Sequence, residues 1–147
     1  FIIGGAVLFG HFLAISTIPF KLADWIGNLP IHKMAVMGVM VFIYFIGEFF
    51  MDSMALIVVT VPIFYPIVQQ LGFDPIWFGV IVVIILEMGL ISPPVGVNVF
   101  VVKGVAPDVP LEKIFHGIWP FWLAMLACLL ILVVFPQIAL YLPNTMF

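Results

Sequence analysis

A proline pair lies inside an apolar run in the stretch Glu87-Met88-Gly89-Leu90-Ile91-Ser92-Pro93-Pro94-Val95-Gly96-Val97-Asn98. Because proline lacks a backbone N–H and clashes with the preceding turn, a helix through this run has to break there. Lipid cannot satisfy the freed carbonyls, so a break at membrane depth persists only inside protein or beside a water-filled cavity. Secondary transporters hold ions and substrates at such broken helices. The stretch therefore indicates a piece of a secondary transporter.

The composition is that of an integral membrane protein. Hydrophobic residues make up 66% of the chain and charged residues 7%, and the mean hydropathy is +1.41. Soluble domains carry about 25% charged residues, so a soluble core is excluded and the lipid bilayer is an expected partner. The formal net charge is -3, and nothing in the sequence resembles a basic nucleic-acid patch, so no nucleic-acid partner is expected. All four cations are lysines, so the chain offers no arginine to clamp a carboxylate. A single cysteine, Cys128, excludes a disulfide framework.

The chain begins with Phe1-Ile2-Ile3, in the middle of an apolar helix and without a methionine or a basic leader. We therefore expect it to be the C-terminal part of a longer polypeptide. Transporter folds often consist of two related halves, so the N-terminal half of the same subunit is an expected partner.

Apolar and polar segments alternate along the chain, and about 20 apolar residues are needed to span a bilayer. The pattern predicts a truncated transmembrane helix (1–18), an interfacial connector (19–33), a re-entrant hairpin (34–70), a broken transmembrane helix (76–104), a polar connector (105–116) and a final transmembrane helix (117–142). The first connector reads as a surface loop with a short amphipathic turn. Asp74 is expected to cap the helix that starts at Pro75, and Asp108 a helix that starts at Pro110.

The hairpin is predicted from two short apolar runs around a polar centre. Residues 34–46 form a run of about 13 residues, roughly 20 Å of helix, which is short for a span. Gly47-Glu48-Phe49-Phe50-Met51-Asp52-Ser53 follows, and then a second short run that ends near Pro62 and Pro66. Two carboxylates at the bilayer centre are costly, and the tip of a hairpin that lines a cavity reduces this cost. The alternative is one long tilted helix through 34–61.

The polar centre of the hairpin carries candidate cation ligands. Glu48 and Asp52 would share one face if they lay on a helix. Asp52 and Ser53 beside Gly47 offer side-chain oxygens and free backbone carbonyls, which suit a small alkali cation. The alternative is that Asp52 caps the second half-helix, where an anion is favourable.

The break offers similar chemistry. Ser92 and Asn98 supply side-chain oxygens, and Gly96 permits backbone conformations that other residues disfavour. The N-terminus of the second half-helix exposes N–H groups that can bind a carboxylate. The alternative is a simple proline kink. Glu87 lies within the membrane on the first half-helix, and it is either functional or a structural partner of a lysine or histidine elsewhere in the complete protein.

Two motifs together resemble a known family. The first motif is Gly47 to Ser53 with the following Pro62-Ile63-Phe64-Tyr65-Pro66-Ile67, and the second is Gly89-Leu90-Ile91-Ser92-Pro93-Pro94-Val95-Gly96-Val97-Asn98-Val99-Phe100-Val101. In this order they are similar to the C-terminal half of the large membrane (M) subunit of tripartite ATP-independent periplasmic (TRAP) transporters. The resemblance implies an all-α membrane protein with an elevator-type fold. Each of its two inverted repeats would contain one re-entrant hairpin and one broken helix.

The resemblance also implies a function and a set of partners. Such transporters import organic acids, such as C4-dicarboxylates or sialic acid, through the bacterial inner membrane by symport with sodium. They receive substrate from a periplasmic binding protein and work with a small membrane (Q) subunit. The resemblance places sodium among Gly47, Asp52, Ser53, Ser92, Pro93, Val95 and Gly96, and substrate at Pro94 and Asn98. No organic cofactor is implied.

Two alternative functions remain open from the sequence. One is a proton-coupled or other two-repeat carrier, in which Glu48, Asp52 or Glu87 would carry protons. The other is a membrane scaffold subunit that does not transport. An enzyme is not indicated, because the chain has no nucleophile elbow, phosphate loop or His/Cys cluster.

Overall fold

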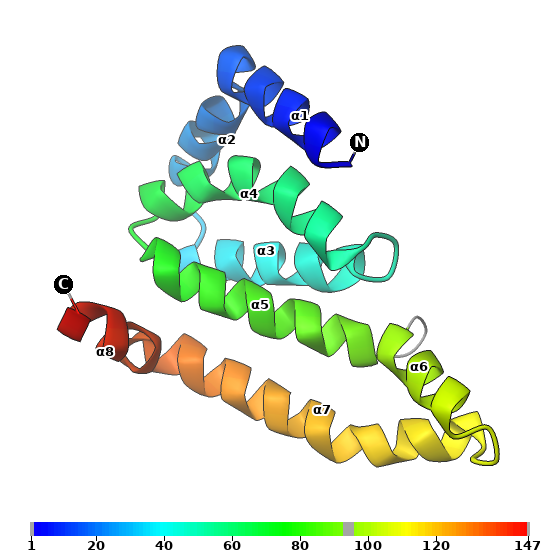
Figure 1. The fold of residues 1–147 in the computed structure, drawn as a ribbon. Helices are drawn as coiled ribbons and strands as arrows, with labels where there is room; N and C mark the ends of the chain where they lie inside the picture. The colour runs from blue at the N-terminus through cyan, green and yellow to red at the C-terminus, as the bar shows by residue number, and fades with distance from the viewer. Residues whose placement is uncertain (1, 93–95, 147) are drawn as a thin grey trace. The chain divides into compact units, whose positions relative to one another are not determined.

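The computed structural model describes residues 2–92 and 96–146, and that part of the chain is helical with no strand (Figure 1). The all-α fold class is therefore confirmed. The helices are α1 (Ile2–Ser16), α2 (Ile18–Gly27), α3 (Lys33–Gly47), α4 (Ser53–Gln70), α5 (Pro75–Ile91), α6 (Val97–Val105), α7 (Leu111–Val134) and α8 (Pro136–Met146). They divide into two compact units, Phe1–Gly79 and Val80–Phe147, which are described separately below. Pro93, Pro94 and Val95 of the predicted site lie outside the described residues.

Two of the described helices are long and apolar enough to cross a membrane, α4 and α7. A third span results if α1 and α2, which are bent by 59° at their junction, count as one. Helices α3 and α5 are apolar but shorter. Many large apolar side chains are exposed, including Phe42, Phe121 and Leu130. Such exposure fits helices surrounded by lipid and by other parts of a membrane protein.

The first unit begins with a sharp corner between α1 and α2. Thr17 adopts the left-handed conformation at this corner, with φ 55° and ψ 11°. The sequence predicts a connector with only a short turn over 19–33, whereas the structure has a ten-residue helix, α2, at Ile18–Gly27. The reason is that Pro19 lies in the first turn of α2, where its missing N–H costs no helical hydrogen bond.

Helices α3 and α4 form a hairpin, visible in Figure 1 where the chain reverses between them. The interpretation of 34–61 as one long helix is therefore wrong, because α3 ends at Gly47 and α4 starts at Ser53. The side chain of Tyr44 is fully buried between them and meets the ring of Phe64 edge-on at a centroid distance of 5.4 Å. The re-entrant course of this hairpin in a membrane stays a prediction.

The second unit contains the end of α5, then α6, α7 and α8. Helix α7 begins at Leu111, inside the predicted connector 105–116, and Pro110 precedes it without a side-chain cap, so the expected Asp108 cap is not formed. The predicted final span 117–142 is divided at Phe135, which leaves the helical conformation before Pro136. Helix α7 packs on both α6 and α8.

Candidate functional site

The predicted site has one half in each unit, so each half is described by itself. The first half is the hairpin end. The carbonyl of Gly47 accepts the N–H groups of Phe50 (3.0 Å) and Met51 (2.9 Å), which closes the turn after α3. A Cβ atom at Gly47 would lie 2.8 Å from a methyl group of Leu56 in α4. Glycine at position 47 therefore lets the two helices approach closely.

Asp52 caps α4. Its Oδ1 accepts the N–H of Met54 at 3.0 Å and of Ala55 at 3.4 Å. The capping interpretation of Asp52 is confirmed, and it leaves Oδ2 outside these two bonds. The carboxylate is exposed in the described chain, so a capping role and a role as a cation ligand are compatible.

Glu48 and Asp52 do not share a helix face, because residues 48–52 form the turn between α3 and α4. Glu48 is 5% exposed, whereas Asp52 is exposed. Ser53 Oγ is buried and has no hydrogen-bond partner among the described residues. A buried hydroxyl oxygen without a partner is costly, and a ligand at this point would remove that cost.

The second half of the site is the break between α5 and α6. Ser92 directly follows α5 and is 3% exposed. Its hydroxyl donates to the carbonyl of Met88 at 2.7 Å and accepts the indole N–H of Trp122 in α7 at 2.7 Å. The sequence did not single out Trp122 for this role, because an interfacial aromatic residue is the usual reading of tryptophan near a helix end.

Gly96 begins the second half-helix in the left-handed conformation, with φ 41° and ψ 53°. Its N–H donates to the carbonyl of Ser92 at 2.9 Å. A Cβ atom there would lie 3.3 Å from the ring of Phe115 in α7. The chain therefore forms two separate helices, α5 and α6, rather than one kinked helix.

The other predicted residues are more open. Asn98 lies in the first turn of α6 and is exposed, as is Glu87 on α5. Among residues 2–92 and 96–146, no group of three or more His, Cys, Asp or Glu side chains could hold a metal ion.

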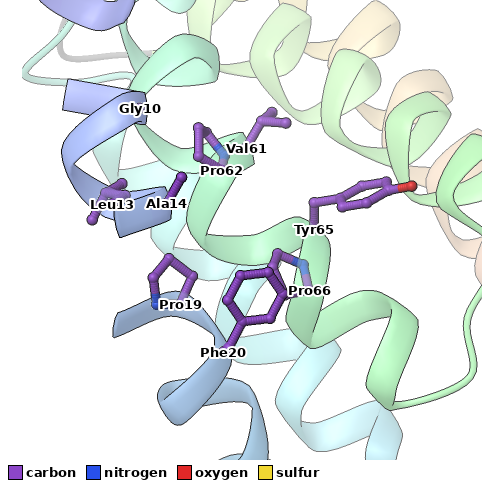
Figure 2. Close-up of a pocket in the computed structure, with 9 residues that line it drawn as sticks. All are labelled: Gly10, Leu13, Ala14, Pro19, Phe20, Val61, Pro62, Tyr65 and Pro66. Carbon is purple, nitrogen blue, oxygen red and sulfur yellow. The ribbon is translucent and has the colours of Figure 1, made fainter. Parts of the chain in front are cut away.

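An apolar pocket of ≈ 280 Å³ lies elsewhere in the first unit, among α1, α2 and α4 (Figure 2). It contains none of the predicted site residues. Pro62 and Pro66 form its wall on α4, and Pro19 and Phe20 lie across from them. The hydroxyl of Tyr65 points away from these rings in Figure 2 and accepts a hydrogen bond from Gln69 at 3.0 Å.

Comparison with known proteins identifies the family. Residues 1–138 match the family model described as the DctM component of the tripartite ATP-independent periplasmic transporter. The chain belongs to this DctM family. The family consists of transporter components, in agreement with the prediction that the chain is not an enzyme.

Curated relatives of this DctM-family chain carry several substrate names. It is 38% identical over 144 residues to the C4-dicarboxylate TRAP transporter large permease protein DctM of Pseudomonas aeruginosa, which covers 98% of the chain and 34% of the relative. It is 32% identical over 143 residues to the sialic acid TRAP transporter large permease protein SiaM of Vibrio cholerae, and the match covers 95% of the chain and 33% of that relative. It is 37% identical over 136 residues to the isethionate TRAP transporter permease protein DctMQ of Oleidesulfovibrio alaskensis, and the match covers 92% of the chain and 21% of that relative. The DctM-family chain thus spans about a third of the length of the large permeases it matches.

Proposed function

We propose that this chain is part of the large permease of a TRAP transporter that imports organic acids by symport with sodium through the bacterial inner membrane. The family supports transport, and the acid class is supported by relatives named for C4-dicarboxylates, sialic acid and isethionate. The N-terminal half of the subunit, a small Q subunit and a periplasmic binding protein complete the proposed assembly. An elevator movement of the hairpin and the broken helix is part of the proposal.

The observation that carries sodium coupling is the state of the Ser92 hydroxyl. It is buried at the end of a broken helix, its proton is committed to Met88, and only acceptor capacity remains on its oxygen. An oxygen of this kind can bind a cation. We propose that Ser92 and Gly96 at the break supply sodium ligands. We propose the same role for Gly47, Asp52 and Ser53 at the hairpin end. Asn98, in the first turn of α6, would bind the acid of the substrate.

Proton coupling is the second candidate, and one observation favours it. Glu48 is 5% exposed in an apolar hairpin, where a carboxyl group can alternate between charged and neutral forms. In that case uptake would follow a proton gradient and would not require sodium.

The test is uptake of labelled organic acids into proteoliposomes that contain the complete permease, its Q subunit and its binding protein, with either a sodium or a proton gradient. The variants are Asp52→Asn and the matched control Asp74→Asn. Asp74 caps α5 through Oδ1 to Ile76 N (2.7 Å), as Asp52 caps α4, and asparagine preserves both caps.

We expect sodium-driven uptake that Asp52→Asn abolishes or shifts to much higher sodium, while Asp74→Asn behaves as wild type. Uptake driven by protons in the absence of sodium would replace sodium coupling by the second candidate. Equal behaviour of the two aspartate variants would reduce Asp52 to a helix cap.

A further inference from the structure

We propose that Trp122 is a positioning residue for cation binding at the break, because its indole N–H holds the Ser92 hydroxyl in the role of an acceptor. The inference rests on the proposed sodium coupling and deepens it. It concerns three residues of the second unit, Met88, Ser92 and Trp122, of which Trp122 lies 30 residues from Ser92 in the chain.

The direction of both hydrogen bonds is fixed by chemistry. A backbone carbonyl only accepts, so the Ser92 hydroxyl proton goes to the Met88 oxygen at 2.7 Å. An indole nitrogen only donates, so Ser92 Oγ uses one lone pair for Trp122 Nε1 at 2.7 Å. One lone pair is left. Ser92 can therefore bind a cation, but in this arrangement it cannot donate to a substrate carboxylate.

Other contacts of α7 keep Trp122 in place against the break. Phe115 lies seven residues before Trp122, about two helical turns, so the two rings emerge from the same face of α7. The Phe115 ring would lie 3.3 Å from a Cβ atom at Gly96, the residue that starts α6. Trp119 lies between them on this face and meets the Trp122 ring edge-on at 5.7 Å.

Without the indole N–H, the Ser92 hydroxyl is free to adopt other rotamers. Serine has three staggered χ1 positions, and a serine hydroxyl in a helix can also donate to the carbonyl three residues before it. The remaining lone pair would then no longer point in one direction. The cost to sodium affinity should be that of one hydrogen bond, a rise of about three- to tenfold in the sodium concentration at half-saturation.

The experiment uses the purified complete permease and measures its thermal unfolding midpoint against sodium concentration, with choline replacing sodium at constant ionic strength. A ligand that binds only the folded state raises the midpoint in a concentration-dependent way, so the titration reports sodium affinity without transport. Trp122→Phe, Ser92→Ala and the double variant are compared with the control Trp119→Phe. Trp119 is on the same face but has no hydrogen bond to Ser92.

We expect Trp122→Phe to shift the sodium titration three- to tenfold, the double variant to resemble Ser92→Ala, and Trp119→Phe to match wild type. Sodium dependence of uptake should shift by the same factor with the maximal rate kept. An unshifted titration in Trp122→Phe, with wild type responding to sodium, would overturn the positioning role alone. Absence of any sodium response in wild type would overturn the proposed sodium coupling as well.

Discussion

The phenolic oxygen of Tyr44 in α3 and the hydroxyl oxygen of Thr60 in α4 lie 2.7 Å apart. Thr60 Oγ1 also lies 2.7 Å from the carbonyl of Leu56, one turn earlier in α4. Because the threonine has one proton and the carbonyl can only accept, Thr60 donates to Leu56 and Tyr44 donates to Thr60. This relay ties the two helices of the hairpin together, and both residues are buried.

Removing either end of this relay should destabilise the hairpin. Tyr44→Phe and Thr60→Val each remove one partner and should lower the free energy of unfolding by about 1 kcal/mol. The double variant should lose less than the sum, because neither group then lacks a partner. Equilibrium unfolding of the complete permease in detergent measures the three values. Additive losses would show that the two hydroxyls do not depend on each other.

Gly96→Ala should be strongly destabilising. Its positive φ disfavours alanine by about 1–2 kcal/mol, and the new Cβ would crowd Val99 and Phe115. Gly104→Ala is the control in the same helix, since a Cβ there meets nothing within 4 Å and alanine is the better helix former. Thermal unfolding should separate the two variants. Equal stability would mean that the break tolerates another backbone conformation.

Gly47→Ala tests the close approach of the hairpin helices. The added methyl group would press on Leu56, which should cost about 1–3 kcal/mol. Combining it with Leu56→Ala should lose less than the two single changes together, because the smaller side chain makes room. Gly38→Ala in α3, which meets nothing within 4 Å, is the control. The free energies of unfolding of the single and double variants are compared in a double-mutant cycle. If Gly38→Ala lowered the free energy of unfolding as much as Gly47→Ala, the packing explanation would be contradicted.

Lys103, in the last turn of α6, forms hydrogen bonds with the segment that follows the helix. Its ammonium group donates to the carbonyls of Pro107 at 2.6 Å and Val109 at 2.7 Å. Lys103→Met keeps the aliphatic stem but loses both charge-assisted bonds, at a cost of about 1.5–3 kcal/mol. Limited proteolysis should cut residues 106–110 faster in this variant. Lys113→Met, which removes an exposed ammonium group, should leave the cleavage rate unchanged.

Local signals explain which features the sequence could predict. The break after Ser92 follows from Pro93-Pro94, the end of α3 from Gly47, and the start of α5 from Asp74 before Pro75, whose cap is formed as expected. Each of these is written in a few adjacent residues. Helix α2 was missed because Pro19 reads as a breaker, although the first turn of a helix tolerates it.

The contact between Trp122 and Ser92 could not be predicted in the same way. The two residues are 30 positions apart, and only the packing of α7 brings the indole to the break. Glu48 and Asp52 would share one face if they lay on a helix, but spacing alone does not reveal that they lie in the turn between α3 and α4. Tertiary packing thus determines the details of the site, while its position along the chain is local information.

The hydrogen bond from Gln70 in α4 to Asp24 in α2, at 2.9 Å, joins residues 46 positions apart. Both α1 and α2 pack on α4, which is made after α3. During synthesis, the corner between α1 and α2 can therefore dock on α4 only after the whole hairpin of α3 and α4 has been made. Because closing a long loop is slow, docking of α1 and α2 should be a late step of folding, and a ribosome-bound chain that stops before Gln70 should leave this corner open to protease.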